Sequence, residues 1–445
     1  MSLRSALSVC VIAVACAGAS CAGAARAPQD GQLAEAIRTR TGAAIRPDGG
    51  AALPPDVRLD DGLTAEEAVA IALWNSPSFQ LTLADLGLAR ADLAEAGMLR
   101  NPVLSLLFPW GPKQLEWTLQ FPFDVIWQRP RRVAAARLNL EAVSQRLVWD
   151  AMSLVADARA AHADAVVADR RVALAVENAE VTSRIAGLTD ARLKAGDISD
   201  LDARGARSDA ARVDIARRAA EYDRDLALLT LTGVLGIEPP AASVTLAAAP
   251  VSAPVACGTD EGLLKDALAT RPDLRAAEIT IEAAGARARW DRSRVLTLIG
   301  ILDGNGRGSD GAEAGPGING EIPIFSRNQG AISRAEAELE RASRRYAAVR
   351  AQVGVEIRSA SVRLRQAQAV VDGWRRDIVP SLEIEQRQAE SAYRGGEVPL
   401  MSLLDVSRRL VDGRVRLLDA EAASLKALIA LERSIGRSCT QPVRN

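Results

Sequence analysis

Aromatic residues are scarce in this chain of 445 residues, and charges of neither sign are in excess. Phe, Trp and Tyr together make up 3% of the sequence, and Lys and Arg number 55 against 56 Asp and Glu. The basic residues are scattered and do not form a stripe, which the phosphate backbone of a nucleic acid would require. The charge pattern therefore argues against a nucleic acid as partner.

Histidine and methionine are nearly absent, which limits metal and enzyme chemistry. The only histidine is His162, and the methionines beyond the leader are Met98, Met152 and Met401, a set that cannot form a soft-metal site. The sequence has no Gly-rich phosphate loop, nucleophile elbow or histidine pair. We expect no enzyme, no cofactor and no metal site, and interpret His162 as a packed or solvent-facing residue of a helix.

Long apolar runs are missing too, apart from a short one near the start. Residues 6–19 are too few to span a bilayer but are typical of a secretory leader. Residues 18–21 resemble a lipoprotein cleavage box, which predicts lipidation at Cys21, whereas 22–24 or 25–27 would suit an ordinary signal peptidase. Because no other run of about 18 apolar residues follows, no transmembrane helix is expected.

Cysteines are few, and their positions are informative. Export would remove Cys10 and Cys16 and leave Cys257 and Cys439 besides Cys21. In an oxidising compartment Cys257 and Cys439 are expected to form a disulfide. The alternative is two unrelated free thiols.

What the chain has in plenty is internal repetition. The sequence around Gly196 recurs around Gly396, residues 75–79 are echoed by 270–274, and Leu235-Gly236 returns as Ile435-Gly436. One unit is therefore used twice. The predicted organisation is a signal peptide (1–21), an irregular lead-in (22–61), repeat 1 (62–238), a linker (239–260), repeat 2 (261–436) and a C-terminal tail (437–445).

Each repeat opens with signals for short helices. Thr64 and Glu67 have the spacing of a capping box, and the first helix runs to about Asn75. Pro77 interrupts it, and Gly97 ends a second helix.

A strand pattern follows these helices. Residues 115–123 alternate between apolar and polar side chains and, with 103–108, predict a β-hairpin. The second repeat is expected to pair 295–302 with 318–324 across a Gly- and Asp-rich loop over 303–317.

Unusually long helices come next. Between residues 131 and 186 there is neither Gly nor Pro, and extended to the turn at Gly196 the helix would measure about 100 Å. It returns over 200–235. A coiled-coil seam is indicated by apolar residues at steps of three and four: Leu140, Val143, Leu147, Ala151, Leu154, Ala158, Ala161 and Ala165. In repeat 2 the corresponding helices are expected over 330–394, with a kink at Pro380, and over 401–435.

The strands are too few for a membrane barrel made from one chain. A closed barrel needs at least eight strands, and each chain offers about four, so three chains could form one of twelve. Six aromatic residues gather around the first hairpin as an interfacial girdle would: Phe108, Trp110, Trp117, Phe121, Phe123 and Trp127. Of these, Trp110, Trp117, Phe121 and Phe123 are the predicted girdle. The alternative is a soluble sheet packed on a helix.

Three sequence stretches carry a family resemblance: 63–68 with 75–77, then 322–330, then 393–400. In this order, and with the duplication, the chain resembles the TolC-like outer-membrane efflux proteins. The stretch 322–330 is most similar to the subgroup that serves tripartite pumps of the resistance-nodulation-division class, including heavy-metal exporters.

The resemblance implies a mainly α fold with a small β part. Two long antiparallel helical hairpins and four β-strands per chain would contribute to a homotrimer with a 12-stranded barrel in the outer membrane of a Gram-negative bacterium. The trimer would extend into the periplasm as the exit duct for an inner-membrane pump and a periplasmic adaptor. The rival reading is a periplasmic adaptor or coiled-coil scaffold, which would carry one hairpin flanked by compact β domains.

The hairpin tips are the expected site of gating and adaptor docking. The glycines permit the reversal, small and apolar residues resemble adaptor contacts of the family, and acidic residues could form rings that select cations or close the mouth. For Asp200 and Asp405, capping of helix starts is an equal alternative. The candidates are Lys194, Gly196, Asp197, Ile198, Asp200, Leu201, Asp202, Arg394, Gly396, Glu397, Val398, Leu400 and Asp405.

Overall fold

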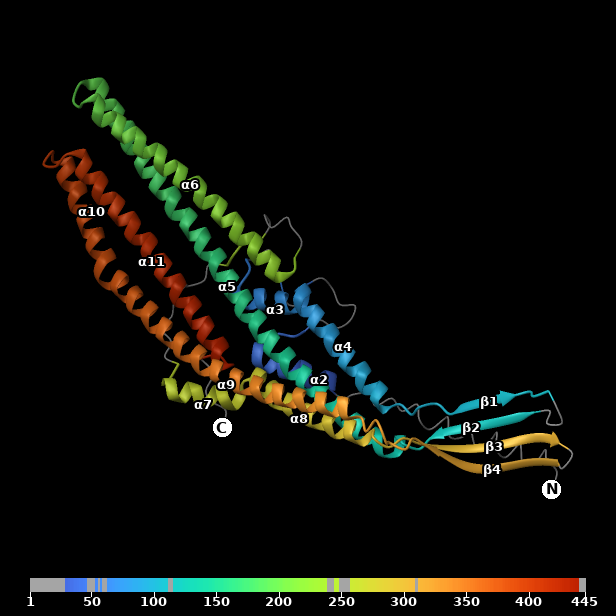
Figure 1. Ribbon diagram of the computed structural model, residues 1–445. Coiled ribbons are helices and arrows are strands. Elements are labelled where there is room, and N and C mark those ends of the chain that lie inside the picture. Colours follow the sequence, from blue (N-terminus) through green and yellow to red (C-terminus); the bar gives the residue numbers. More distant parts are fainter. Residues whose placement is uncertain are drawn as a thin grey trace. The chain divides into compact units, whose positions relative to one another are not determined.

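The computed structural model is mainly helical, with one four-stranded sheet (Figure 1). It describes residues 29–45, 53–54, 57, 62–110, 115–237, 244–247, 257–308 and 311–439. Cys21 and the rest of the predicted leader lie outside these residues. The chain divides into two units. One contains the sheet and the helix segments within Thr82–Leu147 and Pro272–Val349, and the other contains Ala36–Leu81, Val148–Arg271 and Arg350–Asn445.

Two short helices open each repeat, as the sequence predicts. They are α3 (Ala65–Asn75) and α4 (Pro77–Gly97) in repeat 1, and α7 (Asp260–Thr270) and α8 (Pro272–Ser293) in repeat 2. The capping box is confirmed, because the Glu67 N–H donates to the Thr64 hydroxyl at 3.2 Å and the Thr64 N–H donates to the Glu67 carboxylate at 2.9 Å. Both backbone donors at this helix start are thereby satisfied.

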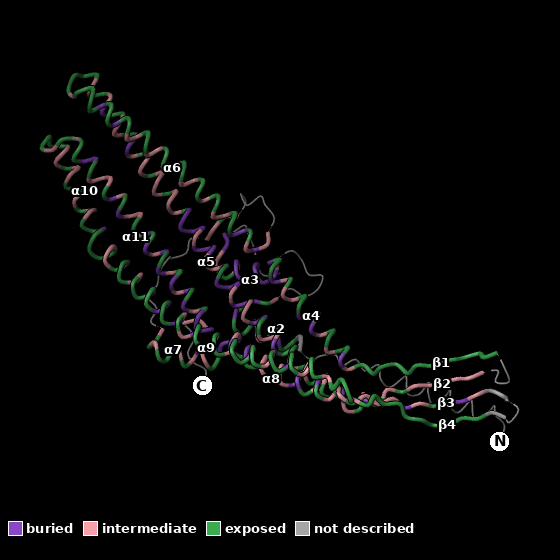
Figure 2. Tube along the Cα trace, in the orientation of Figure 1, coloured by how far each residue is buried: buried purple, intermediate pink, exposed green. Residues whose placement is uncertain are grey.

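The long hairpin of repeat 1 consists of α5 (Val125–Ala195) and α6 (Asp200–Leu235). The predicted seam along α5 is confirmed at Leu140, Leu147, Ala151 and Ala158, which are completely buried, whereas Val143 is half-buried. Figure 2 shows buried stretches recurring along α5. The small side chains of Ala151 and Ala158 allow neighbouring helices to pack closely.

In repeat 2 the outgoing helix is interrupted. α9 (Gln329–Asp372) leads into one wide turn, η2 (Gly373–Ile378), and α10 (Val379–Arg394) resumes with Pro380 in its first turn. Proline has no N–H to donate, and its ring clashes with the carbonyl four residues earlier; the wide turn accommodates both effects. The returning helix is α11 (Leu400–Ile435), which packs along α10 (Figure 1).

The repeated glycines at the ends of α6 and α11 close each repeat on itself. Gly236 has φ +67°, and a Cβ there would lie 2.5 Å from the Asn75 carbonyl oxygen, at the junction of α3 and α4. Gly436, with φ +77°, lies against Arg271 at the junction of α7 and α8. The echo of 75–79 in 270–274 therefore marks the place where each returning helix meets its own short helices.

The sheet has the strand order β1-β2-β3-β4, with every neighbouring pair antiparallel. The strands are β1 (Val103–Leu107), β2 (Glu116–Pro122), β3 (Leu298–Gly308) and β4 (Gly311–Gly320). The first hairpin agrees with the sequence prediction.

The second hairpin corrects the sequence prediction. A loop over 303–317 is wrong, because β3 and β4 continue through most of it, and 321–324 do not belong to a strand. Glycine has low β-propensity and reads as a loop signal. Here β3 pairs with both β2 and β4, and these ladder hydrogen bonds override the local preference.

An irregular lead-in over 22–61 is likewise wrong for Gln29–Thr41, which form helix α2. Ile37 is completely buried, and the Thr41 hydroxyl donates to the Ile37 carbonyl at 2.7 Å at the helix end. Tertiary burial stabilises a segment whose composition suggests a loop.

Candidate functional site: the sheet faces and the hairpin tips

The sheet has one apolar face. Residues directly opposite one another on antiparallel strands project to the same side, so the register extends the alternation of β2 across all four strands. The apolar side comprises Leu104, Leu106, Trp117, Leu119, Phe121, Leu302, Ala314, Pro316 and Ile318.

The other face is mostly polar. It carries Ser105, Glu116, Thr118, Gln120, Asp303, Asn305, Glu313 and Asn319, and also the apolar residues Val103, Leu107, Pro122, Ile299 and Ile301. The Thr118 hydroxyl donates to the Asp303 carboxylate at 3.1 Å across β2 and β3. Such a sheet is suited to lie between an apolar environment and a hydrated one.

Aromatic rings lie over glycines on the apolar face. A Cβ added to Gly304 would lie 2.6 Å from the ring of Trp117, and one on Gly300 would overlap the ring of Phe123. Glycine in a strand often marks such a close approach. The glycines of β3 that suggest a loop in the sequence are therefore where the aromatic side chains of the first hairpin pack.

No helix in the described portion of the chain is both long enough and apolar enough to cross a membrane.

The two hairpin tips share one backbone structure. Gly196 and Gly396 have φ +82° and +76°, in the left-handed region. The Asp197 N–H donates to the Arg192 carbonyl at 3.0 Å, and the equivalent bond after Gly396 measures 2.9 Å. Each glycine N–H also donates to the carbonyl three residues earlier at 3.1 Å. The two bonds together form a Schellman motif, which satisfies carbonyls at a helix end. Nothing occupies the space where either glycine would carry a Cβ, so positive φ alone explains the residue type.

The tips differ in how the returning helix begins. Ser199 caps α6, since its hydroxyl accepts from the Asp202 N–H at 3.1 Å and donates to the Asp202 carboxylate at 2.7 Å. Pro399 begins α11 without a side-chain cap. The first tip is therefore tied to its helix more strongly than the second.

Charged residues at the tips pair along their own helices. Asp200 lies 2.6 Å from Arg204, Asp405 lies 3.2 Å from Arg409, and Arg394 lies 3.8 Å from Glu390. These contacts agree with the capping and solvation alternative; rings of charge at a mouth stay a prediction. Of the other predicted residues, Lys194, Asp197, Leu201 and Glu397 are exposed, Ile198 and Val398 are half-buried, and α11 begins at Leu400.

The two hairpins contact each other just behind the tips. The Arg192 guanidinium donates to the Tyr393 hydroxyl at 2.7 Å and lies 5.0 Å from the centre of its ring. Arg408 forms an ion pair with Asp209, which joins α11 to α6. The sequence prediction does not include these four residues. One sequence signal could have pointed to this contact. Tyr393 is one of 3 tyrosines in the chain, and the equivalent position of the first tip has Leu193.

Farther from the tips, α5 packs against α11. Val166 and Val167 of α5 form a buried cluster with Leu418 and Ala422 of α11. Ion pairs join the same two helices on either side of this cluster: Arg171 with Asp419, Lys426 with Asp164, and Arg159 with Glu432. Compared with these contacts, those of Arg192 with Tyr393 and of Arg408 with Asp209 lie nearer the tips.

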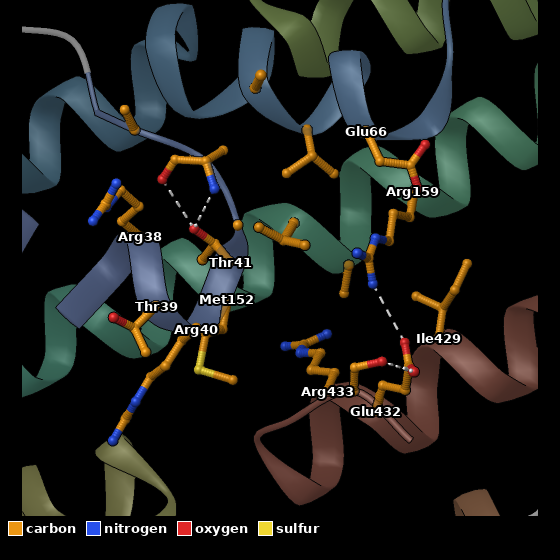
Figure 3. Close-up of a pocket in the computed structure, with 18 of the residues that line it drawn as sticks. Arg38, Thr39, Arg40, Thr41, Glu66, Met152, Arg159, Ile429, Glu432 and Arg433 are labelled. Carbon is orange, nitrogen blue, oxygen red and sulfur yellow. Dashed lines mark hydrogen bonds and ion pairs between the residues drawn. The ribbon is translucent and has the colours of Figure 1, made fainter. Parts of the chain in front are cut away.

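A cavity of about 620 Å³ lies among α2, α3, α5 and α11. Figure 3 shows arginines from three of these helices around it, including Arg38, Arg159 and Arg433, with the pair between Arg159 and Glu432 at 3.3 Å on one side. The described lining residues include no cysteine and no histidine. They therefore do not supply a cysteine nucleophile or a histidine base.

The structure joins Cys257 and Cys439 in a disulfide, which links the end of the linker before repeat 2 to the tail that follows repeat 2. His162 is buried, and its Nε2 lies 2.9 Å from the Leu63 carbonyl, which also accepts from the Ala247 N–H. Its contacts are those of a packed residue. No group of three or more acidic, His or Cys side chains within the described ranges could hold a metal ion.

Comparisons with known proteins agree with this geometry. Residues 263–437 match the family described as "Outer membrane efflux protein". The chain is 24% identical to the cobalt-zinc-cadmium resistance protein CzcC of Cupriavidus metallidurans over 383 residues, which cover 84% of this chain and 90% of CzcC. It is 26% identical to the nickel-cobalt-cadmium resistance protein NccC of Alcaligenes xylosoxydans xylosoxydans, over 82% of this chain and 85% of that protein.

Among solved structures, the CmeC outer membrane channel of Campylobacter jejuni superposes with a TM-score of 0.72. The sequences are 14% identical, and the match covers 89% of this chain and 92% of CmeC. At this identity the similarity shows the fold.

Long paired helical hairpins joined to a sheet with one apolar face define a class of protein, the channels of bacterial outer membranes. Within that class, the chain resembles the TolC-like outer membrane efflux proteins, and the family model matches residues 263–437. It serves in the outer membrane as the exit channel of a tripartite efflux system. The relatives are transport proteins and not enzymes.

Proposed function

We propose that three copies of the chain form one continuous duct, in which twelve strands close a barrel and the helical hairpins extend it through the periplasm. The observation that carries this proposal is the sheet with one apolar and one polar face. Outer-membrane barrels turn apolar side chains to lipid and polar ones to the lumen, and four strands cannot close alone. The number of strands requires more than one copy, and the resemblance to trimeric efflux channels supports three.

The aromatic residues fit the two ends of such a barrel wall. Trp110 follows β1 beyond the pair Leu107 and Glu116. Phe123 follows β2 at the opposite end of the sheet, with Phe121 nearby and Trp117 farther along. Aromatic side chains favour both interfaces of a membrane. We assign Trp110 and Trp117 to one girdle and Phe121 and Phe123 to the other.

The contacts behind the tips would keep the periplasmic mouth closed. Arg192 with Tyr393 and Arg408 with Asp209 hold the two hairpins of one chain together. Partly exposed contacts of this kind contribute about 0–1 kcal/mol each, so a docking partner could replace them. The gate would open when the hairpins separate.

The tips themselves would receive the periplasmic adaptor, which links the channel to an inner-membrane pump of the resistance-nodulation-division class. Leu201 is 79% exposed at the first tip, and Ile198 and Val398 are half-buried. Because Ser199 caps its helix and Pro399 does not, the two tips would make two kinds of adaptor contact.

Divalent metal ions are the first substrates to test. CzcC and NccC carry names that refer to resistance against cobalt, zinc, nickel and cadmium. The test compares the amount of each metal that accumulates in two kinds of cell: cells that express the chain with its pump and adaptor, and cells that lack the chain. Export by the chain should lower the accumulation. Equal accumulation of all four metals would contradict the assignment.

Conductance of the purified protein in planar bilayers tests the gate. Arg192→Gln combined with Arg408→Gln should raise the channel current, because both of the described contacts behind the tips are lost. Arg184→Gln, farther along α5, removes a charge without removing either contact and should leave the current unchanged. An unchanged double variant would contradict the gate, and a native mass corresponding to one chain would contradict the trimer.

A further inference from the structure

The sheet ends on two edges whose pairing is open. Within the part of the chain that the structure describes, β1 and β4 each have a single neighbouring strand. Beside these edges, Leu106, Phe108 and Ile322 are 52%, 71% and 80% exposed. An open edge is not tolerated in hydrocarbon. This inference rests on the proposed trimer, in which the β4 edge of one copy meets the β1 edge of a second copy.

The internal duplication provides a template for that contact. Inside one chain, β2 and β3 join repeat 1 to repeat 2. Between two chains, β4 and β1 would join repeat 2 to repeat 1. If six repeats surround the barrel, both junctions have the same form, and the register of the first predicts that of the second.

Equivalent residues of the two hairpins follow from two prolines. Leu119 lies three residues before Pro122 and pairs with Leu104 on β1. Gly320 lies three residues before Pro323 and pairs with Leu298 on β3. Leu104 and Leu298 are therefore equivalent positions on the first strands of the two hairpins.

The register of β2 and β3 can then be transferred. Inside the chain, Leu119 faces Leu302 and Phe121 faces Gly300. Counting from the equivalent positions, we propose the following contacts between copies: Gly320 faces Phe108 of the partner subunit, Glu321 faces Leu107 of the partner subunit, and Ile322 faces Leu106 of the partner subunit.

This register repeats the packing already present in the sheet. Trp117 covers Gly304 and the ring of Phe123 covers Gly300; Phe108 of the partner subunit would cover Gly320 in the same way. Pairing with a neighbouring strand also explains why β2 continues to Pro122, whereas β4 ends at Gly320. Pro122 belongs to the ladder through its partner Ile299 on β3, and residues 321–323 would join the ladder through the partner copy.

Disulfide cross-linking in the full-length protein tests the register. Leu107→Cys with Glu321→Cys places two thiols on opposite strands, facing the polar side. Ser105→Cys with Glu321→Cys is the matched control, because it projects to the same side but is displaced by two residues. The parent protein with its Cys257–Cys439 bond serves as the background.

After mild oxidation of the trimer in detergent, the 107 and 321 variant should give covalent dimers and trimers on a non-reducing gel, at least tenfold more than the 105 and 321 control. Preferential cross-linking of the control would overturn the register, and a trimer in which neither pair cross-links would overturn contact between the two edges. The native mass is measured on the same samples. A single-chain mass would reject the proposed trimer itself, which distinguishes that failure from a wrong register.

Discussion

Glycine to alanine substitutions at helix ends separate two physical effects that the structure assigns to different positions. Gly196 and Gly236 both end a helix with positive φ. At Gly196 an added methyl group meets open space, whereas at Gly236 it would lie 2.5 Å from the Asn75 carbonyl oxygen and 3.1 Å from Pro77 Cδ. Only Gly236 is thus restricted by both conformation and space.

The expected magnitudes follow from these contacts. Left-handed backbone costs an L-residue about 1–2 kcal/mol, so Gly196→Ala should lose about that much stability. Gly236→Ala adds an overlap with backbone atoms, and overpacking costs about 1–3 kcal/mol more. At Gly436 the nearest atom is Arg271 Cγ at 3.4 Å, an ordinary contact, so Gly436→Ala should resemble Gly196→Ala.

Urea unfolding in detergent, followed by circular dichroism at equal protein concentration, measures the order of the three variants. Gly205→Ala in the interior of α6 is the control of opposite sign, because φ is ordinary there and nothing lies near the added methyl group; it should stabilise by about 0.5–1 kcal/mol. Equal losses for Gly196→Ala and Gly236→Ala would refute the close approach between Gly236 and Asn75.

Four further measurements check other parts of the structure. Cys257→Ser with Cys439→Ser should lower the free energy of unfolding by about 2–5 kcal/mol, since the bond closes a long loop, and a loss below this range in the same urea titration would count against its role. The Ser361 hydroxyl and then Arg365 lower the pKa of Asp260 below its usual 3.8, so this carboxylate stabilises the fold above that pH. The difference in melting temperature between wild type and Asp260→Asn should shrink as the pH falls below 3.8. A difference that does not depend on pH would contradict this role. Gly304→Leu should displace the Trp117 ring and reduce trimer in outer-membrane extracts, whereas Gly315→Leu, where space is open, should not. Mass spectrometry should find a lipid on Cys21, and an unmodified mature chain that begins after residue 24 or 27 would favour the ordinary signal peptidase.

The helical part of the fold could be predicted because its signals are local. The long interval without Gly or Pro, the apolar steps along α5 and the Thr64 capping box each act within a few turns of chain. The positive φ at Gly196 and Gly396 is also a local requirement. Such patterns do not depend on what the rest of the chain does, and the structure agrees with them to within a few residues.

The second β-hairpin and α2 could not be predicted in the same way. Gly300 and Gly304 lower the local preference for a strand, yet they pair with Phe121 and Trp117 of a hairpin far away in the sequence. Ile37 similarly depends on burial by distant segments. In both cases the stabilising partner is remote, so a window of neighbouring residues carries no sign of it.

The sequence by itself determined the duplication, the lengths of the helices, the reversals at Gly196 and Gly396 and the resemblance to efflux channels. Only the tertiary structure decided which residues of the two hairpins touch, namely Arg192 with Tyr393 and Arg408 with Asp209. It also decided the register that divides the sheet into an apolar and a polar face. Helix length and turn position depend on backbone preferences that neighbouring residues set, whereas a contact between hairpins depends on the packing of α5 against α11, which brings together side chains some 200 positions apart in the chain.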